Sequence, residues 1–545
     1  MLSLRRSATR WQYVAVFAAL LAVGVVVFAY QIHTGGFYLD DWLNYRLVQR
    51  PDHTGAFAAL IGYFDVFPSR PGYGLYQVPV WEIFGGDASA QLVWVVVLAA
   101  IMSLSLYTLL LRLGFDGWPA LTCAVLVLVF PFSDATRLWI SAAFVSAAIL
   151  FLLWGVLLTL SALTPGRPIR SAVALHAVAL LCFALSVSTY EVTAPLVVAA
   201  GLLYGARAGW RRAWPRSLAD AAVVALVLAL VTDRGPRTPQ PLSTLSQQAV
   251  ALLTQGVILL GRSLLAFPFV APGVPLALIG VIVAASLAAL RRVRDPAMLV
   301  VLRRWLWRCG AGLLAFFAGY VMYVPAGAYY SPQRSGIGNR INAMSSLGGE
   351  VFIYGILVLA STLIAWGWAT RAGAGPAGAA RVSRVLLTVS LAVVTVGYLV
   401  RLRTDERRYA TAWRQERTIL AAVSRVVGAV PAGSTLYTFG TPAFLYPDFP
   451  IFAAPYDLDA AVAVRGHPRD HAYPVFTPYV SLQCRAGGIS VAGIGYTPTN
   501  GTAYRSQPVV VDLAKGAWHV VAGPRQCARV LAQVQAGPYL EHLVD

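Results

Sequence analysis

The residues best suited to acid–base chemistry are Asp40 and Asp41, in the stretch GGFYLDDWLNYR (residues 35–46). The two carboxylates lie among aromatic side chains, directly after the first long apolar run of the chain. A carboxylate in such a place can accept a proton from a hydroxyl group. The alternative is structural, because an acid at the start of a helix caps it and interacts favourably with its dipole. Two acids in a row, flanked by Tyr38 and Trp42, favour a functional role.

Further ionisable residues lie in short polar stretches between apolar runs: Arg70 in FPSRPGYGLY, Glu191 in STYEVT, and Arg334 and Arg340 around GIGNRINAMSS. Glycines beside Arg340 would let backbone approach an anion, and a guanidinium group can hold a phosphate with two hydrogen bonds. A solvated acid at Glu191 and an ordinary loop arginine at Arg340 are the alternatives.

The composition indicates a chain that crosses a membrane many times. Hydrophobic residues make up 58% of its 545 residues, charged residues only 12%, and the mean hydropathy is +0.66. Soluble domains carry roughly 25% charged residues. The net charge of +19 comes mostly from arginines in short loops between apolar runs, which indicates positive-inside topology and contact with anionic lipid rather than nucleic acid.

The apolar runs and the placement of arginine predict about eleven transmembrane helices, with the N-terminus in the cytoplasm and the C-terminus outside. One run, 250–270, is interrupted by Gly256, Gly261, Arg262 and Pro268. If it spanned the membrane, the basic segment RRVRDP would lie outside. We therefore expect a re-entrant or interfacial helix there.

Two parts are expected. Residues 1–400 form the membrane domain, with a long first external loop at 31–89, and residues 401–545 form a small C-terminal extracytoplasmic α+β domain. Cys484 and Cys527 both fall in the second part and could form a disulfide in an oxidising compartment.

The same topology places the acidic pair, Arg70, Glu191, Arg334 and Arg340 on the outer side, whereas the cytoplasmic loops are basic. Ionisable groups at a membrane tend to line a cavity or a reaction site. No phosphate-binding P-loop or other soluble-enzyme motif occurs in a persuasive context, so ATP-driven work in the cytoplasm is not expected.

An initial span followed by a long external loop that opens with FYLDDW resembles the GT-C superfamily of membrane glycosyltransferases. FPSRPGYGLY is similar to the arginine–proline stretch of its O-antigen-modifying members, and STYEVT and GNRINAMSS are similar to its later acidic and basic positions. The resemblance implies a bacterial enzyme of the plasma membrane and cell envelope. Such enzymes move a hexose or pentose from a polyprenyl-phosphate donor to a hydroxyl group of a glycan, lipid or protein, usually with inversion.

By this resemblance Asp40 is the catalytic base, with Asp41 orienting the acceptor or exchanging roles with it. The departing lipid phosphate would be bound by Arg340 first, with Arg334 and Arg70 as further candidates.

Glu191 would contact the sugar or the acceptor, and Tyr38 and Trp42 would stack on sugar faces, although aromatic residues also form the ordinary membrane belt. No cofactor is required by the sequence. A divalent metal, used by some members, is compatible with the paired aspartates.

Two other functions fit the same composition. A transporter or flippase of lipid-linked saccharides would also have many spans and external charges, but would not need the long first loop or the attached domain. An O-antigen polymerase or ligase would lack the early acidic pair.

Overall fold

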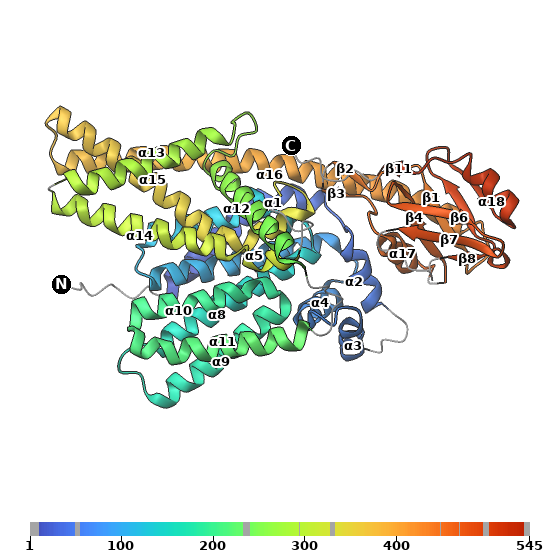
Figure 1. Cartoon of the computed structure of the whole chain (residues 1–545), viewed down its shortest axis with the longest axis horizontal. Helices are drawn as coiled ribbons and strands as arrows, with labels where there is room; N and C mark the ends of the chain where they lie inside the picture. The colour runs from blue at the N-terminus through green and yellow to red at the C-terminus, as the bar shows by residue number, and fades with distance from the viewer. Residues whose placement is uncertain are drawn as a thin grey trace.

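Apolar runs of the length that a membrane requires become helices that lie side by side in a bundle, with a strand-containing domain at one end (Figure 1). The structure is a computed structural model and describes residues 10–49, 55–232, 240–293, 295–326, 333–446, 448–467, 469–493 and 501–538. We call the end of the bundle nearest the C-terminal domain the domain side. The expected fold class, a polytopic helical protein with a C-terminal α+β domain, is confirmed.

Within the described residues, ten helices are long and apolar enough to cross a membrane. They are α1 (Arg10–Thr34), α5 (Ala88–Arg112), α8 (Phe144–Ala162), α9 (Ile169–Thr189), α11 (Trp210–Thr232), α12 (Leu242–Leu264), α13 (Gly273–Arg292), α14 (Pro296–Ala318), α15 (Ala343–Ala372) and α16 (Pro376–Val427). Two helices outside these ten, α6 (Gly117–Leu128) and α10 (Ala194–Ala208), were counted among the expected eleven spans, whereas α12 was not.

Helix α12 differs from the interrupted segment that the sequence suggested. Neither Gly256 nor Gly261 breaks it, and the chain leaves helical geometry only after Leu264. Gly256 lies against Phe316 near the end of α14, and Gly261 lies against Leu276 near the start of α13. Its contacts are therefore with the domain-side ends of its neighbours, although its length and composition would also allow it to span.

The stretch 31–89 is helical rather than an extended loop. It contains α2 (Asp40–Val48), α3 (Ala56–Val66) and α4 (Pro71–Phe84). Short helical turns occupy the other domain-side connections: η1 (Pro131–Ser133), α7 (Ala135–Leu138), η2 (Ser141–Ala143), η3 (Glu191–Thr193), η4 (Val321–Ala326) and η5 (Ile337–Asn342).

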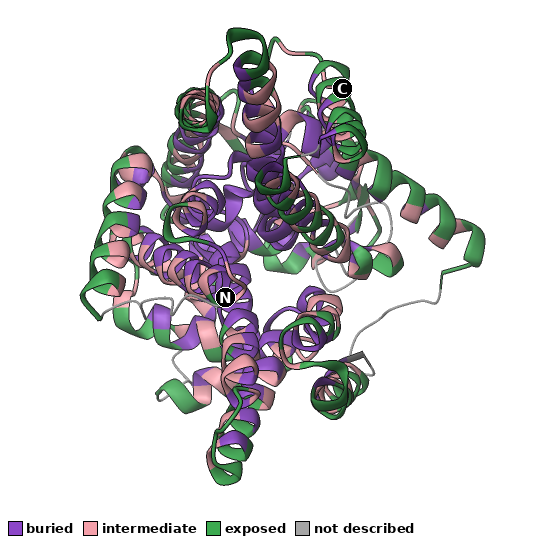
Figure 2. Ribbon diagram, turned by 90° about the vertical axis from the view of Figure 1, so that its left-hand side faces the viewer, coloured by how far each residue is buried: buried purple, intermediate pink, exposed green. Residues whose placement is uncertain are grey.

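Buried residues gather along the middle of the bundle and exposed ones on its outer helices (Figure 2). Helices α14 and α15 approach each other closely. A Cβ added at Gly348 would lie 2.3 Å from the carbonyl oxygen of Gly312, and one at Gly319 would lie 2.5 Å from Oγ of Ser345. Small residues permit this approach in membrane helices. Because η5 leads directly into α15, the same contact holds η5 in place.

The C-terminal domain is built on a four-stranded sheet in the order β10-β9-β1-β4, in which β1 is parallel to β4 and β9. Its elements are β1 (Thr435–Phe439), β2 (Phe444–Tyr446), β3 (Phe449–Pro450), α17 (Pro455–Val464), β4 (His471–Pro474), β5 (Phe476–Thr477), β6 (Val480–Cys484), β7 (Gly488–Gly493), β8 (Thr502–Ala503), β9 (Val509–Asp512), β10 (Ala517–Val520), α18 (Pro524–Leu531) and β11 (Gly537–Pro538). Strands β1 and β9 are buried along their whole length, as expected for parallel strands covered on both faces. The proposed boundary at residue 400 falls inside α16, which runs unbroken from the bundle to the domain.

A disulfide joins Cys484 to Cys527, as the sequence suggested, whereas Cys123, Cys182 and Cys309 are unpaired and buried. The bridge closes a segment of 43 residues.

Replacing both half-cystines with Ser should lower the stability of the domain by about 2–4 kcal/mol, because the unfolded chain regains conformational freedom. Denaturant unfolding of the purified protein would measure this, with Cys182→Ser as the control. Equal midpoints for the two variants would contradict the prediction.

Candidate active site

Asp41 is held rigidly at the start of α2. It is fully buried, one of its carboxylate oxygens accepts hydrogen bonds from the backbone N–H and the hydroxyl of Ser141, and the other accepts from the N–H of Tyr38 at 2.9 Å. Burial, and to a smaller extent the charge of Asp40, raises the pKa of Asp41 to about 8. Both oxygens of Asp41 are thus occupied by donors within the protein, and its buried side chain is not accessible to an acceptor hydroxyl.

Asp40 has the opposite environment. It is partly exposed, and its Oδ1 accepts a hydrogen bond from the hydroxyl of Tyr456 in the C-terminal domain at 2.8 Å. It makes no helix-capping hydrogen bond, since the residue before it, Leu39, is the N-cap and no side chain caps α2. Leu39 has a φ of +46°, a conformation that is costly for a branched side chain and that accumulates at functional sites. The structure thus separates the two aspartates into an accessible one and a buried one.

The glycine pair before these acids allows a close approach between segments. A Cβ at Gly36 would lie 2.0 Å from the ring of Trp413 on α16. The segment that carries Asp40 and Asp41, which we call the aspartate segment, is therefore in direct contact with α16, the helix that leads into the C-terminal domain.

Tyr38 and Trp42 are buried, so in this structure neither ring is open to stack on a sugar. The hydroxyl of Tyr38 donates to the backbone oxygen of Tyr409, and the indole N–H of Trp42 donates to Glu416, at 2.9 and 3.2 Å. Both rings instead attach the aspartate segment to α16.

Arg70 and Glu191 form a two-pronged ion pair. Nε of Arg70 lies 3.1 Å from one carboxylate oxygen of Glu191, and a terminal nitrogen lies 3.0 Å from the other. The Arg70 guanidinium also lies over the ring of Tyr190, 5.2 Å from its centroid. The pair places α4 against η3, and much of the charge of Arg70 is already balanced.

Removing one partner of this pair should destabilise the protein. Because Arg70 is partly exposed, Glu191→Ala should lower the free energy of unfolding by about 1–3 kcal/mol, less than for a fully buried pair. A double-mutant cycle with Arg70→Ala would measure the coupling. Purely additive effects of the two substitutions would show that the contact contributes nothing.

One tryptophan, Trp139, contacts both Arg340 and the aspartate segment. Its guanidinium is 5.2 Å from the ring centroid of Trp139, and the indole N–H of Trp139 donates to the carbonyl oxygen of Tyr38 at 3.0 Å. Tyr190 and Tyr323, whose hydroxyls are 2.6 Å apart, lie within electrostatic range of Arg340. Trp139 thus connects the basic group to the segment that carries the acidic pair, on the domain side.

Two asparagines flanking Arg340 anchor its turn. Nδ2 of Asn339 donates to Asp134 at 2.6 Å, and Nδ2 of Asn342 donates to the carbonyl oxygen of Phe132 at 2.7 Å. Burial and the charge of Asp405 raise the pKa of Asp134. The sequence analysis quoted these asparagines in GNRINAMSS but assigned them no role; their position on both sides of a candidate arginine was the available signal.

Arg334 belongs to a second basic group with Arg401 and Arg262, to neither of which the sequence analysis assigned a role in the site. Arg401 donates to the carbonyl oxygen of Arg334 at 3.3 Å, and Arg262 is repelled by both of the other arginines. Asp405 offsets part of this positive charge, because its Oδ2 lies 3.4 Å from Nε of Arg401. We call these three arginines the arginine cluster. They come from α12, the segment before η5, and α16, so only the folded chain brings them together.

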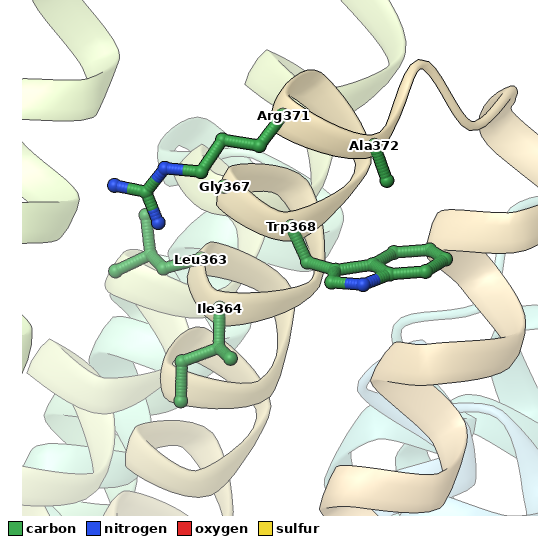
Figure 3. Close-up of a pocket in the computed structure, with 6 residues that line it drawn as sticks. All are labelled: Leu363, Ile364, Gly367, Trp368, Arg371 and Ala372. Atoms are coloured by element: carbon green, nitrogen blue, oxygen red, sulfur yellow. The ribbon is translucent and has the colours of Figure 1, made fainter.

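Among the described residues, no group of three or more His, Cys, Asp or Glu side chains is arranged to hold a metal ion. A groove of about 650 Å³ lies along one end of α15 (Figure 3). All the residues that line it belong to the last turns of α15: Leu363, Ile364, Gly367, Trp368, Arg371 and Ala372. At 1.5 Å per residue it lies about 30 Å along the helix from η5, at the end remote from the aspartates.

No family model matches the sequence, and no curated protein is significantly similar to it. Several solved structures are similar in fold. ArnT from Cupriavidus metallidurans in the apo state is 13% identical, with 83% of this chain and 85% of that chain covered and a TM-score of 0.42. The same protein bound to undecaprenyl phosphate is 12% identical, with 85% and 90% covered and a TM-score of 0.41.

The Archaeoglobus fulgidus oligosaccharyltransferase tethered with an acceptor peptide is 12% identical, with 76% of this chain and 57% of that chain covered and a TM-score of 0.35. Identities and TM-scores this low assign no function to this chain.

Proposed function

We propose that the chain is a membrane glycosyltransferase that moves a sugar from a polyprenyl-phosphate donor to an acceptor hydroxyl at the outer face of the membrane, with inversion. The observation that carries the proposal is that a partly exposed carboxylate, Asp40, and an arginine, Arg340, lie at the same end of an apolar bundle, connected through Trp139. A carboxylate for the acceptor and a cation for the leaving phosphate are the two groups that the reaction needs.

The chemistry is a single displacement. The acceptor hydroxyl loses its proton to Asp40 while its oxygen attacks the anomeric carbon. The bond between that carbon and the phosphate oxygen breaks, and its electron pair leaves with the polyprenyl phosphate. Arg340 stabilises the negative charge that develops on this phosphate. Attack from the face opposite the phosphate inverts the anomeric centre.

The arginine cluster supports a lipid-linked donor. Arg262 lies near the end of α12, and Phe267 and Phe269 follow it in the next segment with stacked rings, that of Phe269 82% exposed. Clustered guanidinium groups beside an exposed apolar surface suit a phosphate attached to an isoprenoid chain. Arg334 therefore remains a candidate for the donor phosphate, in company with Arg262 and Arg401.

The distribution of arginine supports an outer-face site. The ends of the helices remote from the C-terminal domain carry basic residues: Arg112, Arg207, Arg211, Arg212, Arg291, Arg292 and Arg371. Cytoplasmic loops are enriched in such residues. By this rule the domain side, with the aspartates and the disulfide, is extracytoplasmic.

Reconstitution into liposomes with a polyprenyl phosphate that carries a radiolabelled hexose or pentose, plus an extract of cell-envelope glycans and lipids, tests the proposal. We expect label in the acceptor fraction and one polyprenyl phosphate released per sugar transferred. Label that crosses the bilayer still attached to its lipid, with no polyprenyl phosphate released, would identify a flippase instead.

A further inference from the structure

The C-terminal domain reaches the aspartate pair itself. Helix α17 packs along α2, and its Tyr456 donates a hydrogen bond to Oδ1 of Asp40, 416 positions away in the sequence. The start of α17 is well ordered by its own contacts, because the buried Asp457 accepts from the backbone N–H groups of Ala454 and Leu458. The position of the Tyr456 hydroxyl is thus set by the domain.

A second contact on the same side of α17 fixes the two helices at a further point. Asp459, three residues after Tyr456, pairs with Arg46 in the last turn of α2 and with Nδ1 of His471, the latter at 2.9 Å. Residues three apart share a helix face, so Tyr456 and Asp459 both face α2. Contacts near both ends of α2 prevent α17 from rotating or sliding relative to the aspartates.

The same domain also contacts the turn that carries the arginine. The N–H of Ile337, the first residue of η5, donates to the carbonyl oxygen of Asp448 at 2.9 Å. Gly336 has a φ of +69°, and a Cβ there would lie 2.2 Å from that oxygen. The domain therefore contacts both the element that carries Asp40 and the element that carries Arg340.

We propose that the C-terminal domain completes the active site and that Tyr456 is a positioning residue for Asp40. The inference rests on the proposed function. With Oδ1 held by the Tyr456 hydroxyl, the side chain of Asp40 is confined to one orientation and Oδ2 remains to accept the acceptor proton. A hydrogen bond to a charged group is stronger than one between neutral groups, and small losses of alignment at a reacting group are costly in rate.

The test compares Tyr456→Phe with Tyr437→Phe in the full-length reconstituted protein. Tyr437 also bears a hydrogen-bonded hydroxyl, 3.0 Å from Oγ1 of Thr502, in the same domain. Tyr456→Phe should lower kcat about tenfold with the KM values for donor and acceptor within about twofold, whereas Tyr437→Phe should leave kcat unchanged. In an Asp40→Glu background, where the carboxylate is displaced, Tyr456→Phe should change kcat by less than about twofold.

The other outcomes distinguish a failure of the positioning role of Tyr456 from a failure of the proposed function. Equal kcat for the two Tyr→Phe variants, or an equal loss in the Asp40→Glu background, would overturn the positioning role while leaving the glycosyltransferase proposal intact. Full activity of Asp40→Asn would overturn the role of Asp40 as base, and the role of Tyr456 with it. Melting temperatures of all variants identify any loss that comes from unfolding.

Discussion

Replacing Asp40 with Asn is expected to lower the rate of sugar transfer by about 10²–10⁴-fold, the range that a general base contributes. The amide is almost the same size as the carboxylate, and its oxygen can still accept from Tyr456, so the local structure should be retained. Asn cannot take the acceptor proton at neutral pH. Measured kcat should therefore fall while the melting temperature and donor binding stay near those of the unsubstituted protein.

Asp41→Asn is the matched comparison and should behave differently. Both carboxylate oxygens of Asp41 accept hydrogen bonds, from Ser141 and from Tyr38, and an amide offers only one acceptor oxygen. One buried N–H donor would face an NH₂ group, at a cost of about 1–3 kcal/mol. The free energy of unfolding should thus fall in Asp41→Asn but not in Asp40→Asn. The reverse pattern would exchange the roles assigned to the two aspartates.

Replacing Arg340 with Ala should lower kcat by about 10²–10³-fold, because the leaving phosphate would lose a fixed positive group where its charge develops. Arg340→Lys should rescue little, since a lysine cannot reproduce a planar guanidinium over the ring of Trp139. Inhibition by free polyprenyl phosphate, the released product, should weaken in parallel.

Arg417→Ala provides the control for Arg340. Arg417 also places its guanidinium over a tryptophan, 5.8 Å from the ring centroid of Trp413, but it is exposed on α16. Its replacement should leave transfer unchanged. If Arg340→Ala and Arg417→Ala had equal activity, the phosphate role of Arg340 would be wrong.

Structural features that depend on local sequence could be predicted. Long apolar runs and the placement of arginine predicted most of the helices, the alternation of short strands and turns predicted the C-terminal domain, and the two cysteines of that domain form the expected bridge. Asp40 and Asp41 stood out because adjacent acids are unusual after an apolar run.

Features that depend on long-range packing were not predictable. Asp41 is buried because Ser141, 100 positions away, closes over it, and Asp40 meets a tyrosine from the other end of the chain. Aromatic residues such as Tyr38 and Trp42 occur both at sugar-binding surfaces and at membrane interfaces. Only the fold shows that α16 covers these two. The arginine cluster combines residues from three separate segments, none of which has a distinctive local pattern.

The 52 residues of α16 form one unbroken helix that begins in the bundle and ends beside the first strand of the domain. Its stretch from Arg401 to Val427 is about 40 Å long. Tyr409 and Glu416 in this stretch accept hydrogen bonds from Tyr38 and Trp42, and the end of the helix continues into the domain that carries Tyr456. One helix therefore connects the membrane bundle, the segment that contains Asp40 and the domain that contains Tyr456.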